Sequence, residues 1–357
     1  MQAIEFGIYN DEISSKVSKS ARLAGRDDIN IEDQIRVANE LLAGLRILGS
    51  KDAEKLALEI KIHLGRFAKS ILRNECFIAS SHNEKAEVTL IRFLLSFASR
   101  TGGRDRLNIF TTNYDRIIEM GAELAGLHLI DRFVGNLTPI FRASRLNIDM
   151  HYNPPGIRGE PRYLEGVVRY TKLHGSVDWI AHHHTIQRIG LPLGAKRITP
   201  YLKAPGLAGC SPLEIMIYPN ADKERETLGY PYTELFRDFA AAICRPNSTL
   251  VTYGYSFGDE HINRIIMDML TIPSTHLVII SYSDPLGRII QTFQEKPDQI
   301  SLLLGSELGD ISKLTENYLP KAAIDNASAR MADILRKRSS QHEIEEKGNK
   351  GNGENQE

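Results

Sequence analysis

The pattern of hydrophobic and polar positions divides the chain into a helical part and a part in which strands and helices alternate. Residues 1–28 are mixed and polar and show no clear period. From Ile29 onward, apolar residues recur at three- and four-residue spacing, which is typical of one buried helix face. This spacing predicts a helical block with amphipathic helices over residues 29–49, 52–72 and 83–100.

A different pattern begins near residue 105, where short apolar runs alternate with helical periods. The runs interpreted as strands lie in LNIFTTNYD, GVVRYTKLHG, EIMIYP, STLVTYGYSF and THLVIISY, and VDWIAHHHTIQRI is interpreted as a hairpin or two short strands. The helical periods are RIIEMGAELAG, YTELFRDFAAAIC, DEHINRIIMDML and DPLGRIIQTFQ. Strands that are apolar throughout and alternate with helices are typical of a parallel sheet covered on both faces. The predicted fold class is therefore α/β, a Rossmann-like parallel sheet flanked by helices, with an additional all-helical block.

The same pattern predicts four regions along the chain. Two Pro/Gly-rich stretches, residues 131–165 and 190–213, are expected to be insertions with little regular structure. The last residues contain almost no apolar side chains, which predicts disorder. The expected regions are an N-terminal segment with the helical block (1–104), a core with the two insertions (105–305), a C-terminal helix (306–336) and a disordered tail (337–357).

Composition narrows the classes of function. The 357 residues carry 44 Lys and Arg against 45 Asp and Glu, which gives no overall attraction to nucleic acid or to an anionic membrane. Three cysteines lie far apart without a C-x-x-C pair, which argues against a disulfide scaffold and a structural zinc site. No leader-like start is seen, and no apolar stretch approaches the roughly 20 residues that a membrane span needs. We therefore expect a soluble, cytoplasmic protein without a metal.

Polar side chains cluster at three strand-to-loop junctions. The clusters are Thr111-Thr112-Asn113-Tyr114-Asp115, Lys172-Leu173-His174-Gly175-Ser176 and Gly254-Tyr255-Ser256-Phe257-Gly258-Asp259. Each alone could be a turn or a cap; Asp259 could cap the next helix and His174 could be a hydrogen-bonded core histidine. His261 and Asn263 could line a pocket or merely cover it. Because ligands bind beyond the carboxyl ends of strands in open α/β sheets, the three clusters together predict one ligand site.

In this order and at these separations, the three clusters resemble the sirtuin-like (silent information regulator) family. They are most similar to its bacterial antiphage branch of NAD-hydrolysing effectors, found with HerA-like ATPases or in Thoeris-type systems. The resemblance covers roughly residues 105–290. It implies NAD as the substrate, with Asn113 placing the attacking water and His174 acting as the base toward a ribose hydroxyl. The residues that it implies for NAD binding are Thr111, Thr112, Asp115, Gly175, Ser176, Gly254, Ser256, Phe257 and Ser281.

Cleavage of the bond between nicotinamide and ribose requires few catalytic groups. Nicotinamide leaves NAD⁺ as a neutral group, so the protein has to stabilise an oxocarbenium-like transition state and to aim a nucleophile at the anomeric carbon. A neutral amide such as Asn113 orients water without adding charge, and an imidazole such as His174 accepts a proton near pH 7. One Asn and one His suffice in principle, without a metal.

The sequence departs from the family in two places. The Cys pairs that bind zinc in sirtuins are absent, and the helical block of residues 29–100 stands in place of that module, which weakens a deacetylase interpretation. The family's G-A-G-x-S loop, which cradles the pyrophosphate, is not found before Asn113. Either this chain starts at an internal Met of a longer protein, or its N-terminal segment is remodelled.

The resulting hypothesis is an NAD⁺ glycohydrolase that acts as an abortive-infection effector. Two alternatives stay open: a non-catalytic, degenerate sirtuin-like assembly subunit, and an NAD-dependent protein deacylase. Because NAD⁺ depletion kills the host, the resemblance implies control by a partner or by self-assembly. We expect a homo-oligomer, with a HerA-like ATPase as a possible partner.

Overall fold

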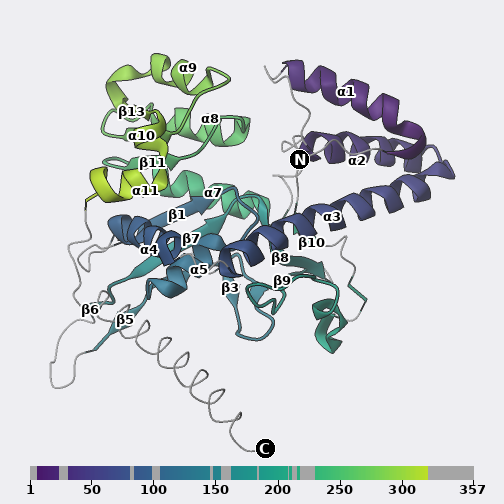
Figure 1. Cartoon of the computed structure of the whole chain (residues 1–357), viewed down its shortest axis with the longest axis horizontal. Helices are drawn as coiled ribbons and strands as arrows, with labels where there is room; N and C mark the ends of the chain where they lie inside the picture. Colours follow the sequence, from purple (N-terminus) through teal and green to yellow (C-terminus); the bar gives the residue numbers. More distant parts are fainter. Residues whose placement is uncertain are drawn as a thin grey trace, which may run out of the picture.

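A computed structural model of the chain describes residues 6–23, 31–80, 84–98, 105–144, 148–153, 162–182, 185–207, 209–210, 215–217 and 230–320. A helical block and an α/β part lie side by side, and the long helix α3 runs between them (Figure 1). The predicted tail 337–357 and most of the predicted C-terminal helix 306–336 fall outside the described residues.

The helical block contains two of the three predicted helices and one that was not predicted. Its elements are η1 (Gly7–Tyr9), α1 (Asn10–Leu23), α2 (Ile31–Ile47) and α3 (Asp52–Ser80). The third predicted helix, α4 (Glu84–Ala98), packs instead on the α/β part. The interpretation of residues 1–28 as having no period was wrong. Ile13, Val17 and Ala21 recur every four residues in α1 and are buried. Helix α1 packs against α2, and Ile13 and Val17 belong to one hydrophobic cluster with residues of α2 and α3. Three apolar residues in a polar helix were too weak a signal to be recognised.

The α/β part confirms the predicted fold class, with its parallel strands divided between two sheets. The first sheet has the order β1 (Leu107–Thr111), β7 (Val167–Lys172), β2 (His128–Ile130) and the second the order β11 (Thr249–Tyr253), β12 (His276–Ser281), β13 (Ile300–Leu304). The sequence interpretation missed β2, which has three residues, and β13, an apolar run of five residues. Among the described strands, β1 pairs with β7 alone and β11 pairs with β12 alone, so β1 and β11 are edge strands of their sheets.

A third sheet of the α/β part is antiparallel. The predicted hairpin at 177–189 is confirmed as β8 (Gly175–His182) and β9 (Thr185–Arg188), in a sheet of order β10-β8-β9-β4-β3. The insertion 131–165 was expected to have little regular structure, but short strands form there. The remaining strands are β3 (Phe133–Val134), β4 (Ile140–Phe141), β5 (His151–Tyr152), β6 (Arg162–Tyr163) and β10 (Ile215–Ile217).

Helices and short turns connect these strands. The α-helices are α5 (Ile117–Leu124), α7 (Tyr232–Ile243), α8 (Glu260–Met269), α9 (Arg288–Glu295), α10 (Ser306–Gly309) and α11 (Ile311–Lys313). The shorter turns are η2 (Tyr201–Lys203), η3 (Pro205–Leu207), η5 (Pro297–Gln299) and the π-helical η6 (Leu314–Tyr318). In place of the single C-terminal helix predicted for residues 306–336, the described chain up to residue 320 forms α10, α11 and η6.

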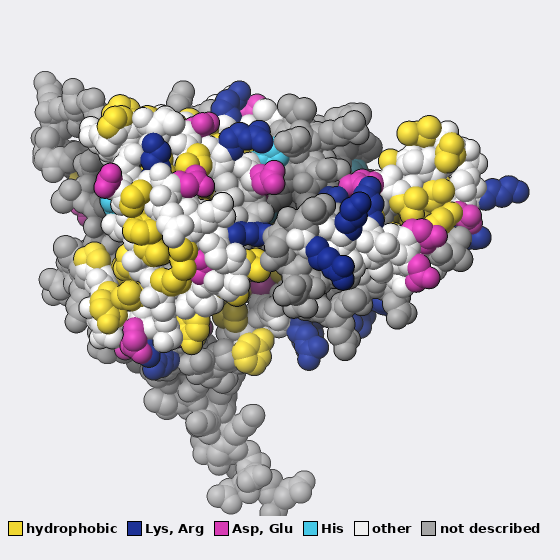
Figure 2. Space-filling model, turned by 90° about the horizontal axis from the view of Figure 1, so that it is seen from above, with side chains coloured by type: hydrophobic (Ala, Val, Ile, Leu, Met, Phe, Trp, Pro, Cys, Tyr) yellow, Lys and Arg dark blue, Asp and Glu magenta, His cyan; other side chains and the backbone are white. Residues whose placement is uncertain are grey.

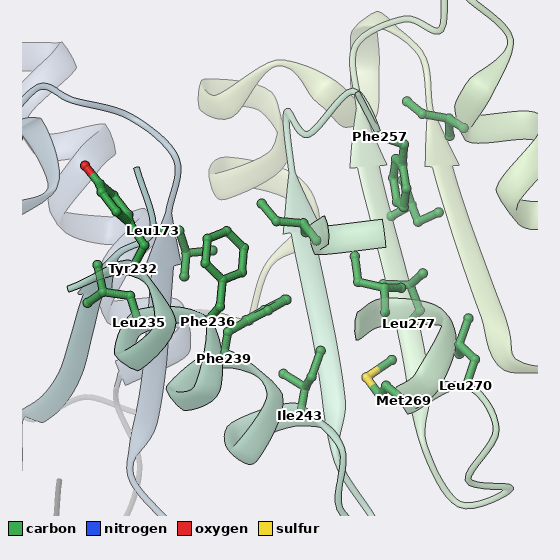
Figure 3. Close-up of a cluster of buried hydrophobic side chains, with 14 of the residues drawn as sticks. Leu173, Tyr232, Leu235, Phe236, Phe239, Ile243, Phe257, Met269, Leu270 and Leu277 are labelled. Carbon is green, nitrogen blue, oxygen red and sulfur yellow. The ribbon is translucent and has the colours of Figure 1, made fainter. Parts of the chain in front are cut away.

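One hydrophobic cluster joins the two parallel sheets. Helix α7 contributes Phe236 and Phe239, which lie between the strands of the first sheet and those of the second (Figure 3). Phe239 makes an edge contact with Phe110 of β1, at 5.0 Å between ring centroids. Leu277 of β12 belongs to the same cluster. The two sheets are thus held together by side-chain packing from α7, which fixes the relative position of their carboxyl ends.

The surface carries a mixture of charges. Basic and acidic side chains both occur across the face in Figure 2, with apolar side chains between them. Among the described residues, no helix combines the length and the apolar character needed to cross a bilayer.

Candidate functional site

Strands β1 and β7 place two of the predicted clusters next to each other. The strands are parallel neighbours, with Thr111 opposite Lys172 at their carboxyl ends. Asn113 and His174 each follow two residues later, so they leave equivalent points of adjacent strands. The Leu173 N–H donates to the Thr111 carbonyl at 2.8 Å, which continues the pairing into the loops.

The loop that carries Asn113 is held by its own backbone contacts. The Asn113 N–H donates to Thr111 Oγ1 at 3.1 Å, and the Tyr114 carbonyl accepts from the Val177 N–H at 3.0 Å. The Asn113 side chain is exposed, and within the described part of the chain no hydrogen bond engages its amide. The loop therefore presents this amide outward on a fixed backbone.

Below this loop lies a buried lysine that the sequence interpretation did not single out. The Lys172 Nζ donates to the Asp115 carbonyl and, at 3.1 Å, to Glu119 Oε1. Burial raises the pKa of the Glu119 carboxyl, while the neighbouring Lys172 charge opposes this rise. Lys172 thereby connects β7 to the loop and to the first turn of α5, and it fixes the backbone at Asp115.

His174 is paired with a carboxylate from the other sheet. Its Nε2 lies 2.9 Å from Asp259 Oδ2, and the two side chains are only 13% and 6% exposed. Asp259 also caps α8, because its Oδ1 accepts from the His261 and Ile262 N–H groups. A carboxylate at Nε2 favours the tautomer that carries its proton there, which leaves Nδ1 as the basic nitrogen of the ring.

The turn after β11 is locked in an unusual backbone conformation. Gly254 has φ +65° and Phe257 has φ +53°, a left-handed value that costs a residue with a side chain roughly 1–3 kcal/mol. The Phe257 ring is buried in the core beside α7 and α8, and the Tyr255 hydroxyl donates to Asn263 Oδ1 at 2.8 Å. Burial raises the pKa of Tyr255, with the Asp259 charge adding to it, so the hydroxyl stays protonated and donates.

An arginine that the sequence interpretation missed stands beside this turn. A Cβ placed on Gly258 would lie 3.0 Å from the Arg288 Nη1 and 3.5 Å from the Ser256 Oγ. The guanidinium and the hydroxyl therefore border the same glycine. Arg288 is the first residue of α9, within the period interpreted as the helix DPLGRIIQTFQ, and no local signal there pointed to a ligand. A guanidinium in this position suits an anionic group such as a phosphate.

The predicted site residues differ in how far they are exposed to solvent. Asn113, Gly254 and Ser256 are exposed, and Thr112, Asp115 and His174 are half-buried. The buried ones are Thr111, Gly175, Ser176, Phe257 and Ser281. The Ser176 hydroxyl donates to the Tyr114 carbonyl at 3.4 Å and the Ser281 hydroxyl to the Ser283 carbonyl at 2.9 Å. These two hydroxyls thus support the loops, and their contact with a ligand stays a prediction.

A comparison with protein-family profiles matches residues 107–301 to the SIR2-like domain. This region is more than half of the chain and contains all three clusters. The chain belongs to the SIR2-like domain family. Domains of this family use NAD, and helices α1–α4 precede the matched region. A comparison with curated proteins found no match.

The residues of this SIR2-like domain fit a dinucleotide. The backbone at Gly254 is open, since no heavy atom lies within 4 Å of a Cβ built there, and Ser256 is exposed beside Arg288. These groups suit a ribose and a phosphate. Asn113 and His174 lie at the end of the neighbouring sheet, and the contact of His174 with Asp259 joins the two sets. Within the ranges that the structure describes, no three metal-ligating side chains cluster.

Proposed function

We propose that this chain is an NAD⁺ hydrolase that cleaves NAD⁺ to nicotinamide and ADP-ribose. The observation that carries the proposal is the hydrogen bond between His174 and Asp259. It joins an imidazole from the sheet that also bears Asn113 to the turn that bears Ser256. A base and a water-orienting amide thus stand on one side of the site, and groups suited to a ribose and a phosphate stand on the other.

Each side chain has a defined task in this reaction. Ser256 and Arg288 hold the ribose and phosphate part, and the Asn113 amide orients a water molecule toward the anomeric carbon. His174 accepts a proton from that water or from a ribose hydroxyl and later releases it to solvent. The new bond joins the water oxygen to the anomeric carbon. The bond to nicotinamide breaks, and its electron pair neutralises the pyridinium nitrogen.

The test is turnover of NAD⁺ by the purified full chain, with nicotinamide and ADP-ribose separated by chromatography. Asn113→Ala and His174→Ala are each expected to reduce turnover by about 100-fold or more. Asn136→Ala and His128→Ala, which change exposed residues of the same types, are expected to leave it unchanged.

The same assay decides between the alternatives. NAD⁺ consumption that requires an acetylated peptide would indicate a protein deacylase. No turnover by the chain in any assembly state, alone or with a HerA-like ATPase, would leave the non-catalytic assembly subunit and contradict the proposal.

We further propose that the enzyme is a cytoplasmic abortive-infection effector that self-assembly or a HerA-like ATPase holds in check. A surface of α3 supports the first form of control. Leu58 and Ile62 lie four residues apart, hence on one helix face, and are 58% and 46% exposed. Leu56 and Ile60 on the opposite face are buried in the helical block. An apolar face on a helix that already buries its other face suits contact with a second copy.

A further inference from the structure

Helix α5, which follows the loop of Asn113, begins at a residue that cannot cap it. Its N-cap is Arg116, whose side chain has no acceptor and makes no capping hydrogen bond. The Ile117 N–H is satisfied by Asp115 Oδ1 at 3.1 Å. The Arg116 N–H needs a partner from elsewhere in the fold.

That partner is Glu75 of α3, 41 residues earlier in the chain. Glu75 Oε1 accepts from the Arg116 N–H at 2.7 Å, and Oε2 accepts from the guanidinium Nη2 at 2.6 Å. The two side chains are 0% and 9% exposed. The Glu75 carboxylate of α3 therefore caps α5 and balances the positive N-terminal end of α5. It also neutralises the buried Arg116 guanidinium.

The rest of the guanidinium and the next residue of α3 extend this contact to a second loop. The Arg116 Nη1 donates to the Leu191 carbonyl, and the Cys76 Sγ lies 3.0 Å from the Gly194 carbonyl. One helical turn of α3 thus fixes both the loop of Asn113 and the stretch that follows β9.

Helix α3 is embedded in two separate cores. Its first half packs in the helical block through Leu56 and Ile60, and its second half packs against the SIR2-like domain through Phe67 and Leu72. Phe67 makes an edge contact with Tyr114, the neighbour of Asn113, at 5.8 Å between ring centroids. With 29 residues the helix is about 43 Å long, and Figure 1 shows it running from α1 and α2 to the strands β8 and β10.

We propose that Glu75 is a positioning residue for the loop of Asn113: it caps α5 from outside the SIR2-like domain and makes the geometry of the active loop depend on the seating of α3. The role assigned to Asn113 rests on the proposed NAD⁺ hydrolysis. The placement of the loop by Glu75 does not, because it concerns the backbone of Asn113–Arg116 alone.

The test compares hydrogen exchange and turnover in full-length variants. Glu75→Gln keeps an oxygen for the Arg116 N–H but removes the charge. We expect the amides of residues 113–117 to exchange about ten-fold faster or more, while those of β12 do not change. We expect kcat for NAD⁺ to fall about ten-fold or more with little change in KM, because the loop carries the water-orienting amide. Glu54→Gln, the same change at an exposed position of α3, is expected to change neither quantity.

A second variant separates positioning from stability. In Glu75→Leu/Arg116→Met the buried ion pair is replaced by apolar side chains, which often preserves stability. We expect a Tm near that of the unchanged chain, but fast loop exchange and low turnover, because the backbone N–H of residue 116 loses its carboxylate acceptor. Two results would overturn the proposal. One is normal loop protection and normal turnover in the double variant, and the other is unchanged loop exchange in Glu75→Gln. If the unchanged chain does not hydrolyse NAD⁺, the proposed function fails, and the exchange measurements alone still decide the role of Glu75.

Discussion

At the scale of single residues, the site depends on side chains with two tasks. Asp259 caps α8 through one oxygen and holds His174 through the other. A capping residue is usually replaceable by another with a small side-chain acceptor, whereas an imidazole partner also needs a negative charge. The double task makes it possible to change one function of Asp259 while keeping the other.

Asp259→Asn is expected to preserve α8 but to impair the base. Asparagine caps helices as well as aspartate does, so we expect Tm to change little. Its amide does not supply the charge that orients and stabilises the imidazole, so kcat for NAD⁺ should fall about 100-fold. In the double variant with His174→Ala, kcat should be almost the same as in His174→Ala alone, because both changes disrupt the same His174–Asp259 pair. A normal kcat in Asp259→Asn would mean that the carboxylate serves α8 alone.

Arg288→Gln is expected to weaken NAD⁺ binding. If the guanidinium holds a phosphate, its loss removes a charge-assisted hydrogen bond, which corresponds to roughly 10- to 100-fold in Kd. Isothermal titration with ADP-ribose measures this loss, and nicotinamide, which has no phosphate, should bind as before. Arg264→Gln on α8 serves as the control, because Arg264 is exposed. Equal affinities for ADP-ribose in both variants would remove Arg288 from the site.

At the scale of elements, buried ion pairs fasten the short strands that the sequence pattern did not predict. Strands β5 and β6 have two residues each, and Arg106 anchors the chain beside them. Its Nε donates to Asp149 Oδ1 at 2.9 Å and its Nη2 to the Met150 carbonyl at 3.0 Å. Such a short hairpin has little stability of its own, so these contacts decide whether it forms.

The stability that this anchor supplies is expected to depend on pH. Burial pushes the pKa of Asp149 upward, but hydrogen bonds from the Arg106 guanidinium and the Met150 N–H outweigh it and hold the pKa below its ordinary value of 3.8. A carboxyl with a lowered pKa contributes stability that is complete above its ordinary pKa and is lost as pH falls through the lowered one.

Asp149→Asn should therefore lower Tm at pH 7, and the difference from the unchanged chain should shrink as pH falls below 3.8. Calorimetry over a series of pH values measures this. Asp105→Asn, which changes an exposed carboxylate, should have little effect at any pH. A Tm difference between Asp149→Asn and the unchanged chain that stays constant down to low pH would mean that the Asp149 charge does not supply this stability.

At the scale of the whole molecule, α3 connects a helical block to the SIR2-like domain. Its exposed apolar residues Leu58 and Ile62 lie on the face opposite the one that packs in the helical block. We propose that assembly at that face acts on the loop of Asn113 through the same helix. The proposed control by assembly would then need no separate sensing domain.

Leu58→Lys/Ile62→Lys is expected to prevent the proposed self-assembly through α3. Two charges on the apolar face would have to be buried without partners, so the mass measured by light scattering should fall to that of a smaller species. Glu54→Lys, which also adds a positive charge to an exposed position of α3, should leave the mass unchanged. A monomeric unchanged chain at all concentrations would exclude self-assembly through this face.

Local patterns were sufficient for most of the longer elements and for the three clusters. Alternation of apolar runs and helical periods predicted the α/β fold, and the clusters at 111–115, 172–176 and 254–259 were each visible within a few consecutive residues. Helix α1 was missed because few apolar residues mark its buried face, and β2 because it has only three residues. Strand β13, an apolar run of five residues, was not recognised either.

The tertiary structure decided which residues stand together. His174 and Asp259 are 85 residues apart and Arg116 and Glu75 are 41 apart, so no periodicity connects them. Arg288 meets Gly258 only because α9 follows the neighbouring strand of the same parallel sheet. A sequence determines local structure through propensity and period, whereas pairings of charge depend on how the elements pack. The amino-acid sequence by itself therefore determined the family's clusters and the fold class, and only the packing of α3, α5 and α8 decided what holds Asn113 and His174 in place.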